Sequence, residues 1–144
     1  MPRASIPPPF NLLLAEDNLP DALLVRAAIR MENLPLEVSI APDGERAIHL
    51  IMTAEKDPEA LCPHVLVLDI NLPRIDGFEV LRRIRASEKF KNLPVIVVTS
   101  SDSPADRRQA AALGARYFRK PVTYDEFIKI GAVLRQFLID NGLI

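Results

Sequence analysis

The sequence contains a single cysteine, Cys62, among its 144 residues. One thiol cannot form a disulfide within the chain, and one thiol alone does not make a zinc site. We therefore expect a half-buried thiol in a reducing compartment. An excess of one charge is also missing, because 18 basic and 19 acidic residues give a net charge of -1. Without a basic excess, nothing favours a nucleic-acid partner.

Long apolar runs are absent as well. Runs such as Val65–Leu68 are far shorter than the ~20 residues that cross a bilayer, so no contact with membrane is expected. The first ten residues, MPRASIPPPF, have one arginine but no apolar run after it, so they do not form a secretory signal. We therefore expect a cytoplasmic protein. Four prolines and no periodic pattern predict a flexible tail over residues 1–9.

Residues 10–144 alternate short apolar runs with longer helical patterns, which predicts one domain. Two of the runs, VLVL and VIVV, are continuously apolar and mostly β-branched. Strands of a parallel sheet that is covered on both faces have this composition. The five predicted strands are Asn11–Ala15, Glu37–Ile40, Val65–Leu68, Val95–Val98 and Tyr117–Arg119.

Helix signals separate these strands. Pro20 suits the first turn of a helix, and Ser103 precedes a proline and an acid in the positions that open another, which should stop near Gly114. Thr123–Glu126 has the form of a capping box, and the helix that it opens is predicted to run to about Asp140. Asp43-Gly44 and Asp76-Gly77 stand before two more. Five strands alternating with five helices predict a doubly wound parallel α/β sheet with right-handed crossovers.

Polar residues follow the strands where such a sheet binds ligands, beyond the carboxyl ends. Glu16 and Asp17 follow the first strand, Asp69 the third, Thr99 the fourth and Lys120 the fifth. Each has an ordinary explanation alone, as a helix cap, a turn residue or a β-branched strand residue. Together, however, three converging carboxylates would repel one another unless a cation joined them. Because the set lacks histidine and cysteine, it favours Mg²⁺ over zinc or copper.

Four motifs at these strand ends resemble the receiver domains of two-component response regulators. They are AEDN at residues 15–18, VLDINLPRIDG at 67–77, VTSS at 98–101 and FRKP at 118–121. The resemblance covers about Phe10 to Phe137. The spacings fit too, with thirty residues from Asp69 to Thr99 and twenty-one from there to Lys120. The resemblance implies a flavodoxin-like, CheY-like fold with strand order 2-1-3-4-5.

The resemblance also implies a role for each matching residue. Asp69 corresponds to the phosphoacceptor, whose carboxylate attacks phosphorus and forms an acyl phosphate. Glu16 and Asp17 correspond to the acid pair that helps to hold Mg²⁺, and the backbone carbonyl of Asn71 would be a further ligand. Thr99 corresponds to the hydroxyl that binds a phosphoryl oxygen.

Two residues of the fifth strand complete the set. Lys120 corresponds to the lysine that pairs with the phosphoryl group as a point charge. Tyr117 lies three residues earlier, where the family has a rotameric aromatic switch that follows the movement of Thr99. The alternative is that Tyr117 is a strand aromatic packed on the last helix.

Within receivers, segments such as LLAEDNLPDALLVRAAI and LDINLPRIDGFEVL resemble the phytochrome-associated single-domain regulators. A histidine kinase, with a phytochrome as one candidate, is then the expected donor. No output domain is expected after the receiver, so the signal would leave through a downstream protein or onward phosphotransfer. His64 departs from this group, which usually has Pro-Asp there; a solvent-exposed loop histidine is favoured over a ligand.

A pseudo-receiver and a phosphohydrolase are the two alternative functions for this sequence. A pseudo-receiver that docks without phosphorylation would lack some of Asp69, Lys120 and the acid pair, and all of these are present. A phosphohydrolase would need a general acid two residues beyond the nucleophile, where this chain has Asn71. We therefore expect no turnover of outside substrates, only self-dephosphorylation.

The C-terminal segment leaves two interpretations open. Its apolar residues could fold back onto the core of the same chain. They could instead form a homodimer through the fourth helix, fifth strand and fifth helix, with arginines pairing across its rim. The apolar residues are Phe137, Leu138, Leu143 and Ile144, and the arginines are Arg116, Arg119 and Arg135.

Overall fold

A computed structural model describes residues 8–144; most of the predicted tail, residues 1–7, lies outside the described residues. The described chain forms a five-stranded parallel sheet in the order β2-β1-β3-β4-β5, as predicted. Each strand contains its predicted range and extends it by at most one residue at either end. The strands are β1 (Phe10–Ala15), β2 (Leu36–Ala41), β3 (Val65–Leu68), β4 (Val95–Thr99) and β5 (Arg116–Arg119).

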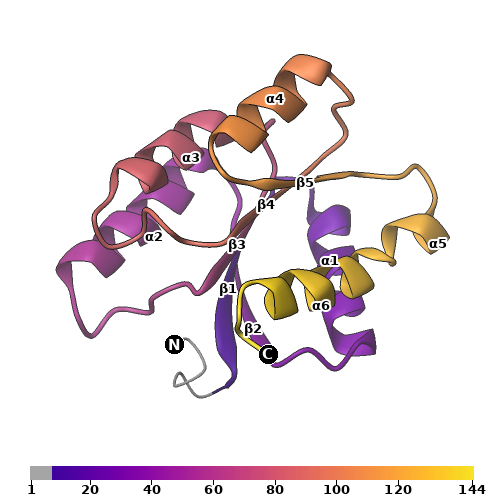
Figure 1. The fold of residues 1–144 in the computed structure, drawn as a ribbon, viewed down its shortest axis with the longest axis horizontal. Helices are drawn as coiled ribbons and strands as arrows, with labels where there is room; N and C mark the ends of the chain where they lie inside the picture. Colours follow the sequence, from indigo (N-terminus) through magenta and orange to yellow (C-terminus); the bar gives the residue numbers. More distant parts are fainter. Residues whose placement is uncertain (1–7) are drawn as a thin grey trace.

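Helices cover both faces of this sheet (Figure 1). The helices α1 (Leu19–Met31) and α6 (Ile130–Asp140) pack on one face, over the inward side chains of β1, β3 and β4. On the other face lie α2 (Gly44–Lys56) and α3 (Gly77–Ala86), with α4 (Pro104–Ala112) beyond them. Every residue of β3 and β4 is buried, which explains the unbroken apolar sequences of β3 and of Val95–Val98 in β4.

Polar side chains cap the beginnings of α1 to α4 and of α5 (Tyr124–Phe127), whereas no side chain of the described residues caps α6. At each of these caps a side-chain oxygen accepts a hydrogen bond from the backbone amide three residues later, which satisfies a donor that the helix leaves unpaired. The caps predicted at Ser103 and Thr123 are confirmed, and α4 ends before Gly114, whose φ is +71°. The five capping residues are Asn18, Asp43, Asp76, Ser103 and Thr123.

The last helix is in two pieces rather than the single run that the sequence predicts. A short α5 (Tyr124–Phe127) is followed by two residues in a turn and then by α6. The amide of Gly131 donates to the carbonyl of Ile128, so the hydrogen bonding tightens to a three-residue spacing. Gly131 lies directly against α1, where a Cβ atom would be 2.8 Å from the carbonyl oxygen of Ala28. The helix therefore changes pitch where Gly131 lies against α1.

The C-terminal apolar residues serve the core of the same chain. Phe137, Leu138 and Leu143 are 5%, 0% and 5% exposed, and all three belong to the cluster between the sheet, α1 and α6. Of the apolar patch predicted at this end, only Ile144 is substantially exposed, so the interpretation that these residues fold back is confirmed for the other three.

The three arginines expected at a dimer rim have partners within the chain. Arg116 pairs with Asp140 at 2.9 Å, Arg119 with Asp102 at 3.7 Å and Arg135 with Glu32 at 3.1 Å. Each of the three is therefore paired without a second subunit.

Three other expectations concern His64, Cys62 and the membrane. His64 is half-buried, accepts the amide of Asn11 on Nδ1 at 2.9 Å and meets the ring of Phe10 edge-on, so the prediction of a solvent-exposed loop histidine is wrong. Cys62 is half-buried, as expected. Within residues 8–144, no helix is both long and apolar enough to cross a membrane.

Candidate functional site

The sheet delivers the predicted polar residues to one rim through its own hydrogen bonding. The amide of Glu16 donates to Ala41 O at 3.0 Å, that of Asp69 to Ala15 O at 3.0 Å and that of Lys120 to Thr99 O at 2.7 Å. These bonds continue the parallel ladder one residue beyond each strand. The backbone of each of these charged residues is therefore held by the sheet.

Three carboxylates converge at this rim. Among the described residues, Glu16, Asp17 and Asp69 form a group in which one oxygen from each lies within 4.8 Å of the others. Glu16 and Asp69 are buried, with 4% and 6% of their surface exposed, whereas Asp17 faces solvent. We call these three residues the acid cluster.

The loop after β3 fixes one member of the acid cluster. Asp69 Oδ1 accepts the backbone amide of Asn71 at 3.0 Å, and the amide of Gly77 donates to Ile70 O at 3.0 Å. Gly77 passes so close that a Cβ there would lie 2.4 Å from the carbonyl oxygen of Asp69. Glycine is therefore required for the loop to close behind the carboxylate.

Lys120 is the positive charge of the site. Its side chain is only 7% exposed, and its Nζ lies 2.8 Å from Glu16 Oε1, 2.8 Å from Asp21 Oδ2 and 3.1 Å from Asp69 Oδ2. An ammonium group has three N–H donors, so these three carboxylates use all of them.

The sequence interpretation missed Asp21. It comes from the first turn of α1 rather than from a strand end, and no motif marked it. Its position, three residues after the cap Asn18, predicts only an acid favoured by the helix dipole. The one available signal was that α1 begins right after the acid pair, so its first turn must lie near the rim.

The ionisable groups of this site shift one another's pKa values. Burial raises the pKa of Glu16 to about 7; the hydrogen bond from Lys120 opposes this change, and the charge of Asp69 adds to it. For Lys120, burial acts to lower the pKa, but the hydrogen bonds to Asp21 and Glu16 and the charge of Asp69 outweigh it and raise the pKa. The ammonium is thus permanently charged, while the acid cluster carries more negative charge than its surroundings favour.

Thr99 lies fully buried at the end of β4, beside the acid cluster. Its Oγ1 accepts the side-chain amide of Asn71 at 3.3 Å and the backbone amide of Ser101 at 3.2 Å. The hydroxyl therefore joins the loop after β3 to the loop after β4.

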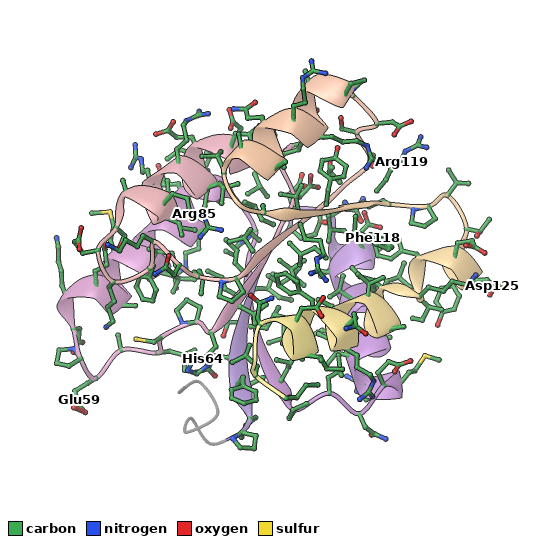
Figure 2. All side chains as sticks on the ribbon, in the orientation of Figure 1. Glu59, His64, Arg85, Phe118, Arg119 and Asp125 are labelled. Carbon is green, nitrogen blue, oxygen red and sulfur yellow. The ribbon has the colours of Figure 1, made fainter. Side chains whose placement is uncertain are left out.

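Tyr117 is half-buried on the α4 side of the sheet, packed with Val97 and Ala110. The alternative interpretation, that Tyr117 packs on the last helix, is therefore wrong. Its neighbour Phe118 faces that helix (Figure 2), and the ring of Phe118 lies 6.4 Å from that of Phe127. The hydroxyl of Tyr117 donates to the carbonyl of Ser101 at 2.8 Å. Tyr117 thus contacts Ser101, the residue whose backbone amide donates to Thr99.

The donor set fits a hard divalent cation. Three carboxylates without histidine or cysteine offer oxygen only, which is what Mg²⁺ and Mn²⁺ take in proteins. The raised pKa of Glu16 agrees with this assignment, because burial and the charge of Asp69 both disfavour its ionised form, which a bound cation would favour.

Comparison with known proteins gives matches over most of the chain. The family model for the response regulator receiver domain matches residues 12–131. The probable methanogenesis regulatory protein FilR2 of Methanothrix harundinacea is 31% identical over 130 residues, which cover 90% of this chain and 83% of that protein. Response regulator Rcp1 of Synechocystis is 33% identical over 99 residues, which cover 69% of this chain and 67% of Rcp1. By contrast, the chain spans only 46% of the transcriptional regulatory protein TrcR of Mycobacterium tuberculosis, at 35% identity.

Solved structures agree with these matches. The phosphorylated cyanobacterial phytochrome response regulator RcpA is similar to this chain with a TM-score of 0.83 and 28% identity, over 92% of this chain and 96% of RcpA. The Mn²⁺-bound form of Rcp1 gives the same TM-score, identity and coverage.

Proposed function

The chain belongs to the response regulator receiver family, and from this premise we propose that it is a single-domain regulator that accepts a phosphoryl group on Asp69 from a histidine kinase. One observation carries the proposal. The Asp69 carboxylate is buried between two further acids and an ammonium that it contacts at 3.1 Å. An acid held in this way serves neither as a helix cap nor as a solvent-exposed turn residue.

The reaction assigns a task to each group at the rim. An oxygen of Asp69 attacks phosphorus, the new O–P bond forms, and the bond from phosphorus to the donor nitrogen breaks and leaves its electron pair on the donor. Lys120 offers an N–H to the transferred phosphoryl group, and Thr99 offers its hydroxyl. The two lie on neighbouring strands, joined by the 2.7 Å backbone bond from the amide of Lys120 to Thr99 O.

Glu16, Asp17 and Asp69 would hold the divalent cation, with the backbone carbonyl of Asn71 as a further ligand. We propose Mg²⁺; bound there, it would neutralise charge on the phosphoryl oxygens. The acid cluster supports this assignment, and the relative Rcp1 has been solved with Mn²⁺.

The output is proposed to run through Thr99 and Tyr117 to the face made by α4, β5 and the α5–α6 helix. Both side chains contact the loop after β4, Thr99 through the Ser101 amide and Tyr117 through the Ser101 carbonyl. A movement of Thr99 toward a phosphoryl group would pull on the support of Tyr117. The changed face would then bind a downstream protein, or the phosphoryl group would move on to another carrier.

The donor is proposed to be a cytoplasmic histidine kinase, with a phytochrome as the first candidate, because RcpA is a phytochrome response regulator. A pseudo-receiver is the rival. It would dispense with the charged contacts, whereas this chain has every one of them. Asn71 offers no proton for sustained hydrolysis, so we do not propose an enzyme with outside substrates.

A small phosphodonor tests the proposal directly. With phosphoramidate and Mg²⁺ the protein should gain one phosphoryl mass that base removes, as expected for an acyl phosphate. Asp69→Asn should abolish the gain. Asp125→Asn, an exposed acid with no partner in the described structure, is the matched control and should react as wild type does. Equal modification of Asp69→Asn and wild type would show that the acceptor is another residue.

A further inference from the structure

The carboxylate of Asp21 contacts Lys120 as closely as any member of the acid cluster does, yet Asp21 lies outside that cluster. It sits on α1, not on a strand end, and 22% of its side chain is exposed against 7% for that of Lys120. Its 2.8 Å contact joins two residues that are 99 positions apart in the sequence.

The common role of an acid at this helix position does not explain why the carboxylate of Asp21 points to Lys120. At the third helical position, an acid often reaches back to the backbone amide of the capping residue. In this chain that amide, on Asn18, already donates to Glu16 Oε2 at 3.1 Å. Glu16 therefore occupies the position that Asp21 would fill, and the carboxylate of Asp21 turns to Lys120 instead.

The other two partners of Lys120 have a second task. Glu16 and Asp69 both belong to the acid cluster, so a divalent cation held there would draw on the same oxygens that the ammonium contacts. Repulsion between two cations would then push Lys120 outward. Asp21 is the one carboxylate in contact with Lys120 that the cation would leave to it.

We infer that Asp21 is a positioning residue, the carboxylate that keeps Lys120 at the rim when a divalent cation occupies the acid cluster. This inference deepens the proposed function and rests on it, because a held ammonium is useful where a phosphoryl group arrives. Asp21 would act only through Lys120 and would touch neither the metal nor the phosphoryl group.

The first test does not use the reaction. The protein is saturated with Mg²⁺ and pulsed with an amine-acetylating reagent, and each lysine is followed by mass spectrometry. Lys120 should stay protected in wild type and be labelled severalfold faster in Asp21→Asn. Lys56 and Lys129, both exposed, are internal standards, and Asp125→Asn, which removes a first-turn acid of α5, should leave Lys120 protected.

The second test measures acyl-phosphate formation with phosphoramidate at saturating Mg²⁺. Asp21→Asn should slow it by about tenfold, the lower end of what a hydrogen bond between charged groups contributes. Asp21→Glu keeps the charge and should recover part of the rate. Because the third carboxylate contact is lost and not the metal ligands, raising the Mg²⁺ concentration should not restore the rate.

Either of two results would overturn the inference: equal labelling of Lys120 in metal-saturated wild type and Asp21→Asn, or a rate that returns to normal with more Mg²⁺. Failure of the proposed function has a different signature, since wild type itself would then take up no phosphoryl group while the labelling result would stand.

Discussion

At the scale of single residues, the site is a balance of three buried or half-buried carboxylates around one ammonium, with a fourth acid at the surface. Polar residues that follow parallel strands are expected at one edge of the sheet, and this expectation placed Glu16, Asp69 and Lys120 correctly because the backbone ladder fixes them. It could not place Asp21, since a first-turn acid can face solvent or turn inward with no change in the sequence pattern. The outcome depends on Glu16 taking the Asn18 amide, a tertiary contact.

This balance predicts opposite effects of two substitutions in the metal-free protein. Lys120→Met should lower the free energy of unfolding by about 3 kcal/mol, because it leaves buried acids without their counter-charge. Asp69→Asn should raise it, because the charge of Asp69 opposes ionisation of Glu16 while Lys120 keeps two carboxylate partners. Urea unfolding in the presence of EDTA measures both. If Asp69→Asn is instead less stable than wild type, the hydrogen bonds that Asp69 accepts stabilise the fold by more than its charge destabilises it.

At the scale of elements, local chemistry was enough to predict most boundaries. Caps such as Ser103 and Thr123 and the apolar runs of β3 and β4 are set by neighbouring residues, and they appear where predicted. The division of the last helix into α5 and α6 was not predictable in this way. It occurs where Gly131 meets Ala28 on α1, and a contact between residues so far apart in sequence leaves no local pattern.

The contact between Gly131 and Ala28 predicts whether Gly131→Ala stabilises or destabilises the protein. In a free helix Gly131→Ala would stabilise by up to about 1 kcal/mol, since alanine is the better helix former. Here the added Cβ would lie 2.8 Å from the carbonyl oxygen of Ala28 and 2.8 Å from Cγ of Glu32. We therefore expect a loss of about 1–3 kcal/mol, the usual cost of overpacking, in chemical denaturation. A more stable variant would show that α6 can move away from α1 at no cost.

At the scale of the whole molecule, the strand order is the one predicted from the sequence. The other feature at this scale is the surface that is proposed to bind partner proteins. Of the apolar C-terminal residues considered for a dimer, Phe137, Leu138 and Leu143 are core residues and Ile144 is exposed, so deleting residues 138–144 would remove part of the core. The face made by α4, β5 and the α5–α6 helix is instead lined by ion pairs. Arg116 with Asp140 and Arg119 with Asp102 place both signs of charge on it.

A surface patch that carries both positive and negative charges can be self-complementary. In a homodimer through this face, ion pairs within each chain would be replaced by the same ion pairs between chains. Exposed ion pairs contribute little to folding, and exchanging them costs correspondingly little. We expect sedimentation velocity at micromolar concentration to show a dimer that weakens as salt is raised. Arg119→Glu should dissociate it by placing like charge opposite Asp102. Arg82→Glu is the matched control, because Arg82 is an exposed, ion-paired arginine on α3, away from the proposed face. A monomer at every salt concentration, with and without phosphodonor, would show that this face meets other proteins and not a second copy of itself.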